Sequence, residues 1–268
     1  MSEQTNQHSM KKHSRSFHLA GLMLPRHVLR DVRQLYAYCR EMDDAVDELN
    51  RPEETAQEKA ALASGQSRIQ SLITRHNIPP DVVDAFLTAL TADTPPVEVK
   101  TEQELLAFCY GVAGTVGVMM CHVLGVANRQ ALYHAIDMGI AMQLTNIARD
   151  RAEDENNNRC YFPKGMSQAD MVHMAEPYYK SGISGTGFLP RSVRPSILAA
   201  ALVYRDIGRK ILQNPEAART SRMIVPRHRK LICALKGGAK AVLSQQPQTH
   251  DARLHQQIVD FPCTHGGA

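Results

Sequence analysis

Tryptophan is absent from this sequence of 268 residues, and aromatic residues make up only 5% of it. A hydrophobic core must therefore consist mainly of aliphatic side chains and the twelve methionines, and the hydrophobic content of 43% is sufficient for a core of good size. The six cysteines are scattered without a C-x-x-C pair. This argues against a disulfide framework or a cysteine zinc site and favours free thiols in a reducing compartment.

The first 16 residues lack the apolar stretch of a secretory signal peptide, so we expect a cytoplasmic protein. Residues 1–150 carry 14 Lys/Arg and 18 Asp/Glu, whereas residues 151–268 carry 17 and 9. The basic second half, densest at residues 226–230, could attract phosphates or the anionic inner face of a membrane. No aromatic residues interleave with the basic ones and no nucleic-acid-binding motif occurs, so we expect no nucleic-acid partner.

Strand-like alternation does not persist beyond a few residues, whereas apolar residues recur at helical spacing through most of the chain. Helices are predicted over residues 28–48, over residues 80–90, and after a capping box formed by Thr101 and Glu104. The glycines and prolines between Gly182 and Pro195 predict a loop. The sequence thus predicts an all-α protein.

No internal repeat or low-complexity linker divides the chain, so we expect a single domain over residues 13–246. Residues 1–12 are expected to form a flexible N-terminus and residues 247–268 a disordered tail. The oligomeric state is left open.

The stretch from Leu105 to Asn128 contains no Asp, Glu, Lys or Arg and is long enough for a membrane span. Four glycines and several polar residues interrupt it, which weakens the hydropathy signal. Small residues at 111, 114, 117 and 121 would form a groove where another backbone or a long thin ligand approaches closely. We therefore favour central helices that line an apolar cavity over a membrane span.

Two segments, residues 36–48 and 143–154, place acidic and phosphate-binding side chains at helical spacing. Steps of three and four residues keep side chains on one face of a helix. The residues that share a face are Tyr36, Arg40, Asp43 and Asp47 in the first segment, and Gln143, Asn146, Asp150 and Asp154 in the second. For either segment alone, a plain solvated face is the simpler interpretation.

Both segments, however, lie among apolar residues, and carboxylates crowded on a partly buried face repel one another unless a cation neutralises them. Oxygen ligands of this kind suit Mg²⁺, with Mn²⁺ as an alternative. Two facing columns would hold cations that in turn hold a polyphosphate. Together with the apolar cavity, this specifies a prenyl diphosphate as the ligand.

Several segments of the chain resemble the squalene/phytoene synthase family, and within it the bacterial phytoene synthases. The matching segments are residues 13–17, 35–44, 110–120, 143–154, 159–163 and 175–208. The resemblance implies a helical isoprenoid-synthase bundle with a central apolar cavity. It also implies a Mg²⁺-dependent prenyltransferase that condenses two geranylgeranyl diphosphates head-to-head, through a cyclopropylcarbinyl diphosphate, to phytoene.

The resemblance also assigns roles to individual residues. The expected Mg²⁺ ligands, which count as catalytic, are Asp43, Asp47, Asp150 and Asp154, and Tyr36 and Tyr161 complete the catalytic set. The expected contacts to substrate are His13, Ser14, Arg15, Ser16, Arg40, Gln143, Asn146, Arg149, Tyr204 and Arg222.

Two alternatives remain open. A C15 enzyme would make presqualene diphosphate, squalene or dehydrosqualene from farnesyl diphosphate, and a non-catalytic relative would bind lipid or serve in assembly. Squalene formation requires NADPH, which the phytoene reaction is not expected to need. The segment 164–175 is shorter than in the family, which either trims the lid at residues 159–161 or leaves the site more open to water.

Overall fold

The computed structural model describes residues 21, 23–49, 69–242, 247–256 and 258. Helices dominate these residues, as predicted, and strands are limited there to two pieces of two residues each. The predicted site residues His13, Ser14, Arg15 and Ser16 lie outside the described residues, as does the predicted flexible N-terminus.

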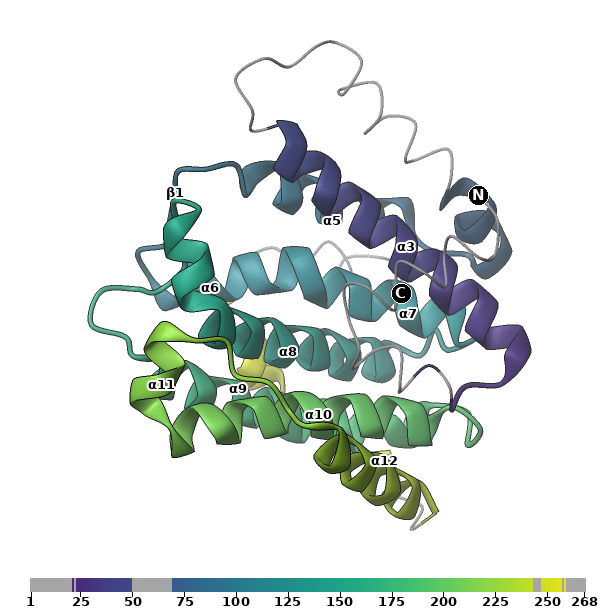
Figure 1. The fold of residues 1–268 in the computed structure, drawn as a ribbon. Coiled ribbons are helices and arrows are strands. Elements are labelled where there is room, and N and C mark those ends of the chain that lie inside the picture. The colour runs from purple at the N-terminus through teal and green to yellow at the C-terminus, as the bar shows by residue number, and fades with distance from the viewer. Residues whose placement is uncertain (1–20, 22, 50–68, 243–246, 257, 259–268) are drawn as a thin grey trace.

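The long helices lie roughly in layers (Figure 1). Helices α3 and α5 lie on one side of α8, and helices α10 and α12 lie on its other side. The elements are α3 (Arg26–Leu49), α5 (Pro80–Ala92), β1 (Val97–Glu98), α6 (Glu102–Cys109), the π-helix η1 (Tyr110–Gly114), α7 (Thr115–Val123), α8 (Arg129–Asn156), β2 (Arg159–Cys160), α9 (Gln168–Gly185), the 3-10 helix η2 (Thr186–Phe188), α10 (Arg194–Gln213), α11 (Pro215–Thr220), α12 (Arg227–Val242) and the 3-10 helix η3 (Ala252–His255).

Local sequence signals fix several helix starts. The Thr101 hydroxyl accepts a hydrogen bond from the Glu104 backbone N–H at 3.1 Å, as the predicted capping box requires. The Glu104 carboxylate, however, accepts from the Lys100 N–H at 2.7 Å, one residue before the cap. Asn128 caps α8, the helix that carries the second acidic column, by accepting from two backbone N–H groups.

The uncharged run forms a nearly continuous helix from α6 through η1 to α7, packed against α8. A Cβ added at Gly117 would lie 2.3 Å from the Ala135 carbonyl oxygen, so glycine is needed for this approach. By length and composition, Glu102–Val123 could cross a membrane, yet 56% of its most apolar window is buried within the protein. That burial is typical of a core helix, and one such helix is weak evidence for a membrane span.

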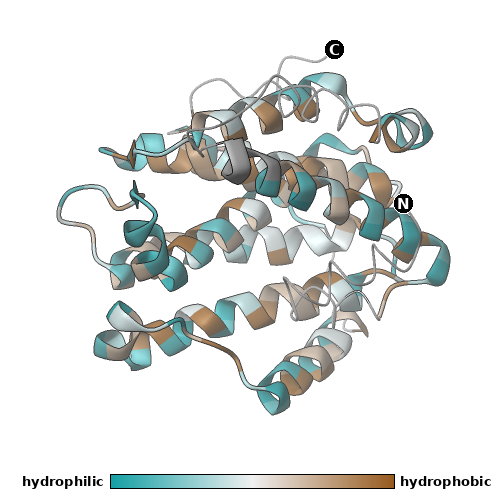
Figure 2. Ribbon diagram, turned by 45° about the horizontal axis from the view of Figure 1, so that its top comes forward, coloured by the Kyte–Doolittle hydropathy of each residue, from teal (hydrophilic) through white to brown (hydrophobic). Residues whose placement is uncertain are grey.

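The loop predicted between Gly182 and Pro195 is confined to residues 189–193 in the structure, so the prediction was wrong for residues 182–188. Helix α9 continues to Gly185 and passes into η2. A Cβ at Gly182 would lie 2.8 Å from the Met138 Cβ, and one at Gly185 would lie 2.1 Å from the His134 Cβ. These glycines permit close packing of α9 on α8 rather than a turn. Figure 2 shows pale residues, of intermediate hydropathy, along the inner helices.

The expectation of disorder from Pro247 onward does not hold for residues 247–256. The His250 backbone N–H donates to the Gln130 side-chain oxygen at 2.7 Å, and the His250 side chain is buried against α8. Ile258 is buried as well. Polar contacts with α8 therefore offset the conformational entropy lost by this segment.

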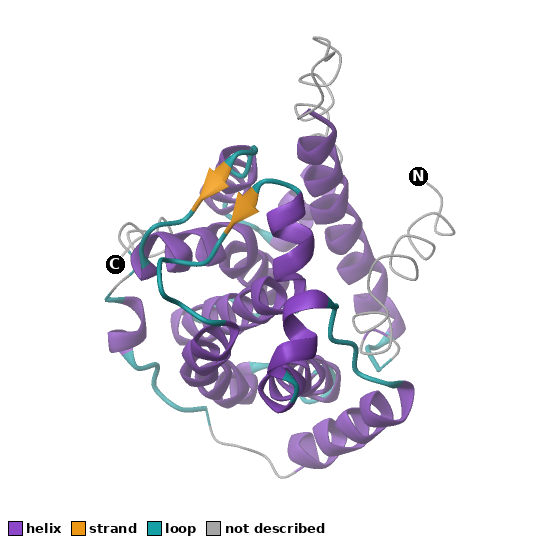
Figure 3. Ribbon diagram, turned by 60° about the vertical axis from the view of Figure 1, so that its left-hand side comes forward, coloured by secondary structure: helices purple, strands orange, loops and turns teal. Residues whose placement is uncertain are grey.

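The two strands pair in parallel, with Val97 opposite Arg159 and Glu98 opposite Cys160 (Figure 3). This pairing joins the segment after α5 to the segment after α8. It brings Asp93 and Arg159 to the same end of the bundle as the carboxyl end of α8.

Candidate active site

The two acidic columns predicted from the sequence border one polar cavity of about 450 Å³. The predicted site residues that line it are Tyr36, Arg40, Asp43, Gln143, Asn146, Arg149, Asp150, Asp154, Tyr161, Tyr204 and Arg222. Asp47 lies on α3, one turn after Asp43, but its side chain is outside the described part of the structure. The structure therefore brings together all the predicted site residues whose side chains it describes.

On α3, Arg40 bridges two carboxylates of the next turn. Its Nη1 lies 2.6 Å from Asp43 Oδ2 and its Nη2 lies 3.1 Å from Asp44 Oδ1. The Nε of Arg40 is buried and has no hydrogen-bond partner among the described residues. Arg40 thus orders the first column and keeps a donor available at the cavity.

On α8, Asp150 is held by two arginines. Arg149 binds it with both Nε, at 2.8 Å, and Nη2, and Arg222 Nε lies 3.1 Å from Asp150 Oδ1. Arg222 also reaches Glu153, at 3.3 Å. Although burial alone would lower the pKa of Arg149, its hydrogen bonds with Asp150 and the attraction of that charge raise it. Arg149 therefore remains cationic at the cavity.

Asp154, one turn further along α8, lies in a negative environment. Burial raises its pKa to about 7, and the charges of Asp150, Glu153 and Asp93 add to the effect. Asn146 Oδ1 is buried without a hydrogen-bond partner among the described residues. Excess carboxylate oxygen and an unused amide oxygen form an oxygen-only donor set, which fits a hard divalent cation such as Mg²⁺.

The polar cavity is also lined by residues that we did not predict, among them Asp93, Phe108, Glu153 and Arg159. We call the part of the cavity lined by Asp93, Arg159 and Tyr161 its mouth. The Tyr161 hydroxyl donates to Asp93 Oδ1 at 2.6 Å, and Arg159 Nε lies 3.6 Å from Asp93 Oδ2. The ring of Phe108 stacks on that of Tyr161 with centroids 4.8 Å apart. Asp93 merely follows a predicted helix, so no sequence signal marked it. Glu153 and Arg159 adjoin predicted residues and could have been included on that ground.

Behind the polar cavity lies an apolar one of about 290 Å³. Residues that line both cavities are Tyr36, Cys39, Val112, Gln143, Asn146 and Tyr204. The apolar cavity continues between α7, α8 and α10 to His134, Gly185 and Leu189. A ligand with a charged head and a long hydrocarbon tail would therefore find both environments in sequence along one path.

The helical fold and the polar cavity joined to an apolar one agree with a match to a known family. The chain belongs to the squalene/phytoene synthase family, whose family model matches residues 10–169. The chain is 30% identical to the 15-cis-phytoene synthase of Enterobacter agglomerans, covering 88% of this chain and 95% of that protein. It is 33% identical to the phytoene synthase of Thermus thermophilus, covering 75% and 80%.

Solved structures agree on the fold. A dehydrosqualene synthase bound to a ligand superposes with a TM-score of 0.76 at 24% identity, covering 88% of this chain and 95% of that one. The squalene synthase HpnC from Alicyclobacillus acidocaldarius superposes with a TM-score of 0.66 at 18% identity, covering 79% and 93%. These likenesses confirm the predicted all-α isoprenoid-synthase bundle.

Proposed function

We propose that this protein condenses two geranylgeranyl diphosphates head-to-head to phytoene, through a cyclopropylcarbinyl diphosphate, releasing two diphosphates and two protons. The observation that carries this proposal is the joining of a carboxylate- and arginine-lined cavity to an apolar one. The similarity to phytoene synthases over most of the chain supports the choice of product.

Asp43, Asp47, Asp150 and Asp154 would hold Mg²⁺, or Mn²⁺ in its place. The bound ions would neutralise the diphosphate and make it a better leaving group. The proposal fits the oxygen-only donor set and the negative surroundings of Asp154.

The side chains of this protein supply the remaining steps. Arg40, Arg149 and Arg222 would donate charge-assisted hydrogen bonds to the diphosphate oxygens, and Gln143 and Asn146 would orient them. Burial raises the pKa of Tyr161, with the charge of Asp93 adding to the effect, so its hydroxyl stays protonated and remains a donor at the mouth.

The apolar cavity would hold the hydrocarbon tails and keep water away from the allylic cation formed when diphosphate leaves. Tyr36 and Tyr204 line the junction between the two cavities, where that cation would form. His13, Ser14, Arg15 and Ser16 remain proposed contacts of the first substrate.

The short segment 164–175 contains the start of α9, at Gln168. Ser167 caps this helix in a reciprocal capping box with Asp170, and the buried Gln168 side chain donates to the backbone carbonyls of Ala148 and Ala218. Because this connection is well bonded and the mouth residues Arg159 and Tyr161 are paired with Asp93, we expect the trimmed lid to support activity.

The second candidate is a C15 enzyme that makes presqualene diphosphate, squalene or dehydrosqualene from farnesyl diphosphate. The fold shared with a dehydrosqualene synthase is compatible with this candidate, because the length of the prenyl chain that is accepted depends on the depth of the cavity. A non-catalytic role is less favoured, because a scaffold has no need for carboxylates in register across a cavity.

The deciding experiment incubates the purified protein with farnesyl or geranylgeranyl diphosphate and Mg²⁺, with and without NADPH, and identifies the hydrocarbon. We expect a C40 product from the C20 substrate without NADPH, and none when EDTA replaces Mg²⁺. A C30 product alone would establish the C15 candidate. No product from either substrate would contradict the enzymatic function.

We also propose that α12 rests on the anionic inner face of the cytoplasmic membrane. Its outer face exposes Leu231, Leu235 and Val242, with 58%, 68% and 82% of their surface accessible. Lys230 and Lys236 lie beside them on the same helix. Figure 2 shows mixed teal and brown residues along this helix. Apolar side chains flanked by cations are typical of helices that lie in a membrane interface. Flotation with anionic vesicles tests this, and Leu231→Asp with Leu235→Asp should reduce binding; flotation unchanged by this pair would contradict it.

A further inference from the structure

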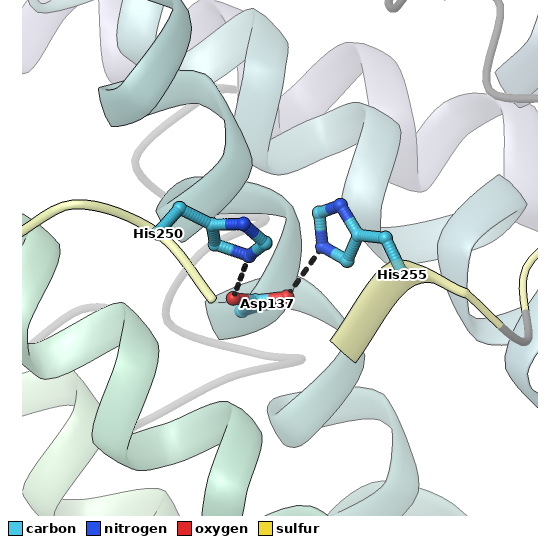
Figure 4. Close-up of side chains that lie close together, drawn as sticks. All are labelled: Asp137, His250 and His255. Carbon is cyan, nitrogen blue, oxygen red and sulfur yellow. Dashed lines mark hydrogen bonds and ion pairs between the residues drawn. The ribbon is translucent and has the colours of Figure 1, made fainter. Parts of the chain in front are cut away.

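A second cluster of ligand-type side chains lies away from the active site. Asp137 of α8 is fully buried and meets two histidines of the C-terminal segment (Figure 4). His250 Nε2 lies 2.8 Å from one carboxylate oxygen and His255 Nε2 lies 2.7 Å from the other. The three ligand atoms all lie within 4.8 Å of one another.

The active site does not use this cluster. Asp137 precedes Asp150 by more than three helical turns, which is about 20 Å along α8. Neither Asp137 nor the two histidines line the polar or the apolar cavity, although the neighbouring His134 does line the apolar one. The cluster is therefore a separate feature that the proposed reaction leaves unexplained.

Further contacts hold the carboxylate in place. The Ser181 hydroxyl of α9 donates to Asp137 Oδ2, and His134 Nδ1 lies 2.8 Å from the same hydroxyl oxygen. His134 Nε2 donates to the Gln248 carbonyl at 2.9 Å, because a carbonyl can only accept. Such bonding behind a ligating carboxylate is typical of built metal sites.

We propose that Asp137, His250 and His255 bind a divalent transition-metal cation of the Zn²⁺ class, which fastens the C-terminal segment to α8. Two imidazole nitrogens and one carboxylate oxygen suit Zn²⁺, Co²⁺ or Ni²⁺, whereas Mg²⁺ prefers oxygen alone. A tetrahedral Zn²⁺ would set its ligand atoms about 3.4 Å apart, so each histidine nitrogen would need to move roughly 0.6–0.7 Å away from the carboxylate oxygen that it now contacts.

The site also explains how two histidines so close together are accommodated. Both face one buried carboxylate, and a cation there would bind the imidazoles through Nε2 while a water completed the coordination. The alternative is a metal-free clasp in which each histidine donates a hydrogen bond to Asp137. The two arrangements differ in metal content, so they can be separated by experiment.

The test uses the full-length protein without an affinity tag, stripped with a chelator and returned to buffer with excess Mg²⁺ to occupy the carboxylate-rich cavity. Co²⁺ is titrated while its visible absorption is followed, and Zn²⁺ is then added as competitor. We expect one equivalent to bind with a four-coordinate spectrum, to be displaced by Zn²⁺, and to bind at least tenfold more weakly in His250→Ala and His255→Ala. The matched control is His228→Ala, an exposed histidine on α12, which should bind as the unaltered protein does.

A second readout does not depend on the variants folding. Zn²⁺ should raise the Tm of the stripped, unaltered protein in a concentration-dependent way, and chelator should reverse the rise. Absence of saturable Co²⁺ binding, or equal binding in all variants, would overturn the proposal and leave the metal-free clasp. Neither readout uses enzymatic activity, so the result is independent of the product the protein makes.

Discussion

Asp137 and Asp154 lie on the same helix, but the pKa of the first is lowered and the pKa of the second is raised. Burial alone would raise the pKa of Asp137, yet hydrogen bonds from His250 and His255 lower it. Burial raises the pKa of Asp154 to about 7, and neighbouring carboxylates reinforce the effect. The difference shows that partners, rather than burial alone, decide the state of a carboxylate in this bundle.

The two environments also predict different consequences of mutation. A carboxylate with its own donors contributes to stability, and losing it leaves those donors without partners. A carboxylate among other carboxylates contributes little to stability and is available to a cation. We therefore expect Asp137 to matter mainly for folding, and Asp154, as a proposed Mg²⁺ ligand, to matter mainly for activity.

The largest effect should come from Asp150→Asn, which removes a proposed Mg²⁺ ligand. We expect turnover to fall by at least about 1,000-fold, because the ions neutralise the leaving group, while the helical circular dichroism is retained. Glu155→Gln is the control, since Glu155 is exposed on the same helix and does not line the cavity. Turnover within a few-fold of the unaltered protein would refute the metal assignment.

Next in size is Asp137→Ala, which should lower the free energy of unfolding by about 3 kcal/mol, because two histidines and Ser181 lose their acceptor. Urea denaturation with EDTA present measures this. Glu155→Ala, which removes an exposed pair with Arg151, should cost at most about 0.5 kcal/mol. Equal losses of stability in the two variants would contradict the expectation that the buried Asp137 contributes more to folding than an exposed carboxylate of the same helix.

Gly139→Ala tests the segment of α8 that joins the two regions. A Cβ there would lie 2.2 Å from the Ala113 carbonyl oxygen, so either α8 or η1 must move. We expect a loss of about 1–3 kcal/mol in stability. Gly238→Ala on α12, where a Cβ would meet nothing within 4 Å, is the control and should not destabilise.

The smallest effect concerns Asp31, another buried carboxylate, which bonds Arg75 and His76 at 2.9 Å each. Burial alone would raise its pKa, but these partners lower it below its ordinary value. Its stabilisation is therefore present above the unfolded-state pKa and is lost as pH falls through the folded-state value. Asp31→Asn should cost about 1–2 kcal/mol at neutral pH. The difference from the unaltered protein should shrink in acid; a constant difference down to pH 2 would contradict it.

Much of the fold and of the site follows from local pattern. The spacing of Asp150 and Asp154 places both on one face of a helix, whatever the rest of the chain does. Pro80 and Asn128 mark helix starts by chemistry that depends on a few neighbouring residues. Such features depend on side chains within one or two turns and can be predicted from the sequence.

Other features depend on contacts between distant segments. Gly182 and Gly185 suggested a loop, but they face α8, where a larger side chain would collide. Asp93 joins the mouth only because β1 pairs with β2 across some 60 residues of chain. No local pattern distinguishes a glycine that permits packing from one that permits a turn.

The sequence by itself determined the helical class, the acidic columns and the family, because each of these depends on spacing along one helix or on a local motif. Only the tertiary structure decided which carboxylates are satisfied. Asp137 and His250 are 113 residues apart, and their contact arises from the way the chain folds back on α8. The same residue type on the same helix therefore stabilises the fold at one position and is available for chemistry at another.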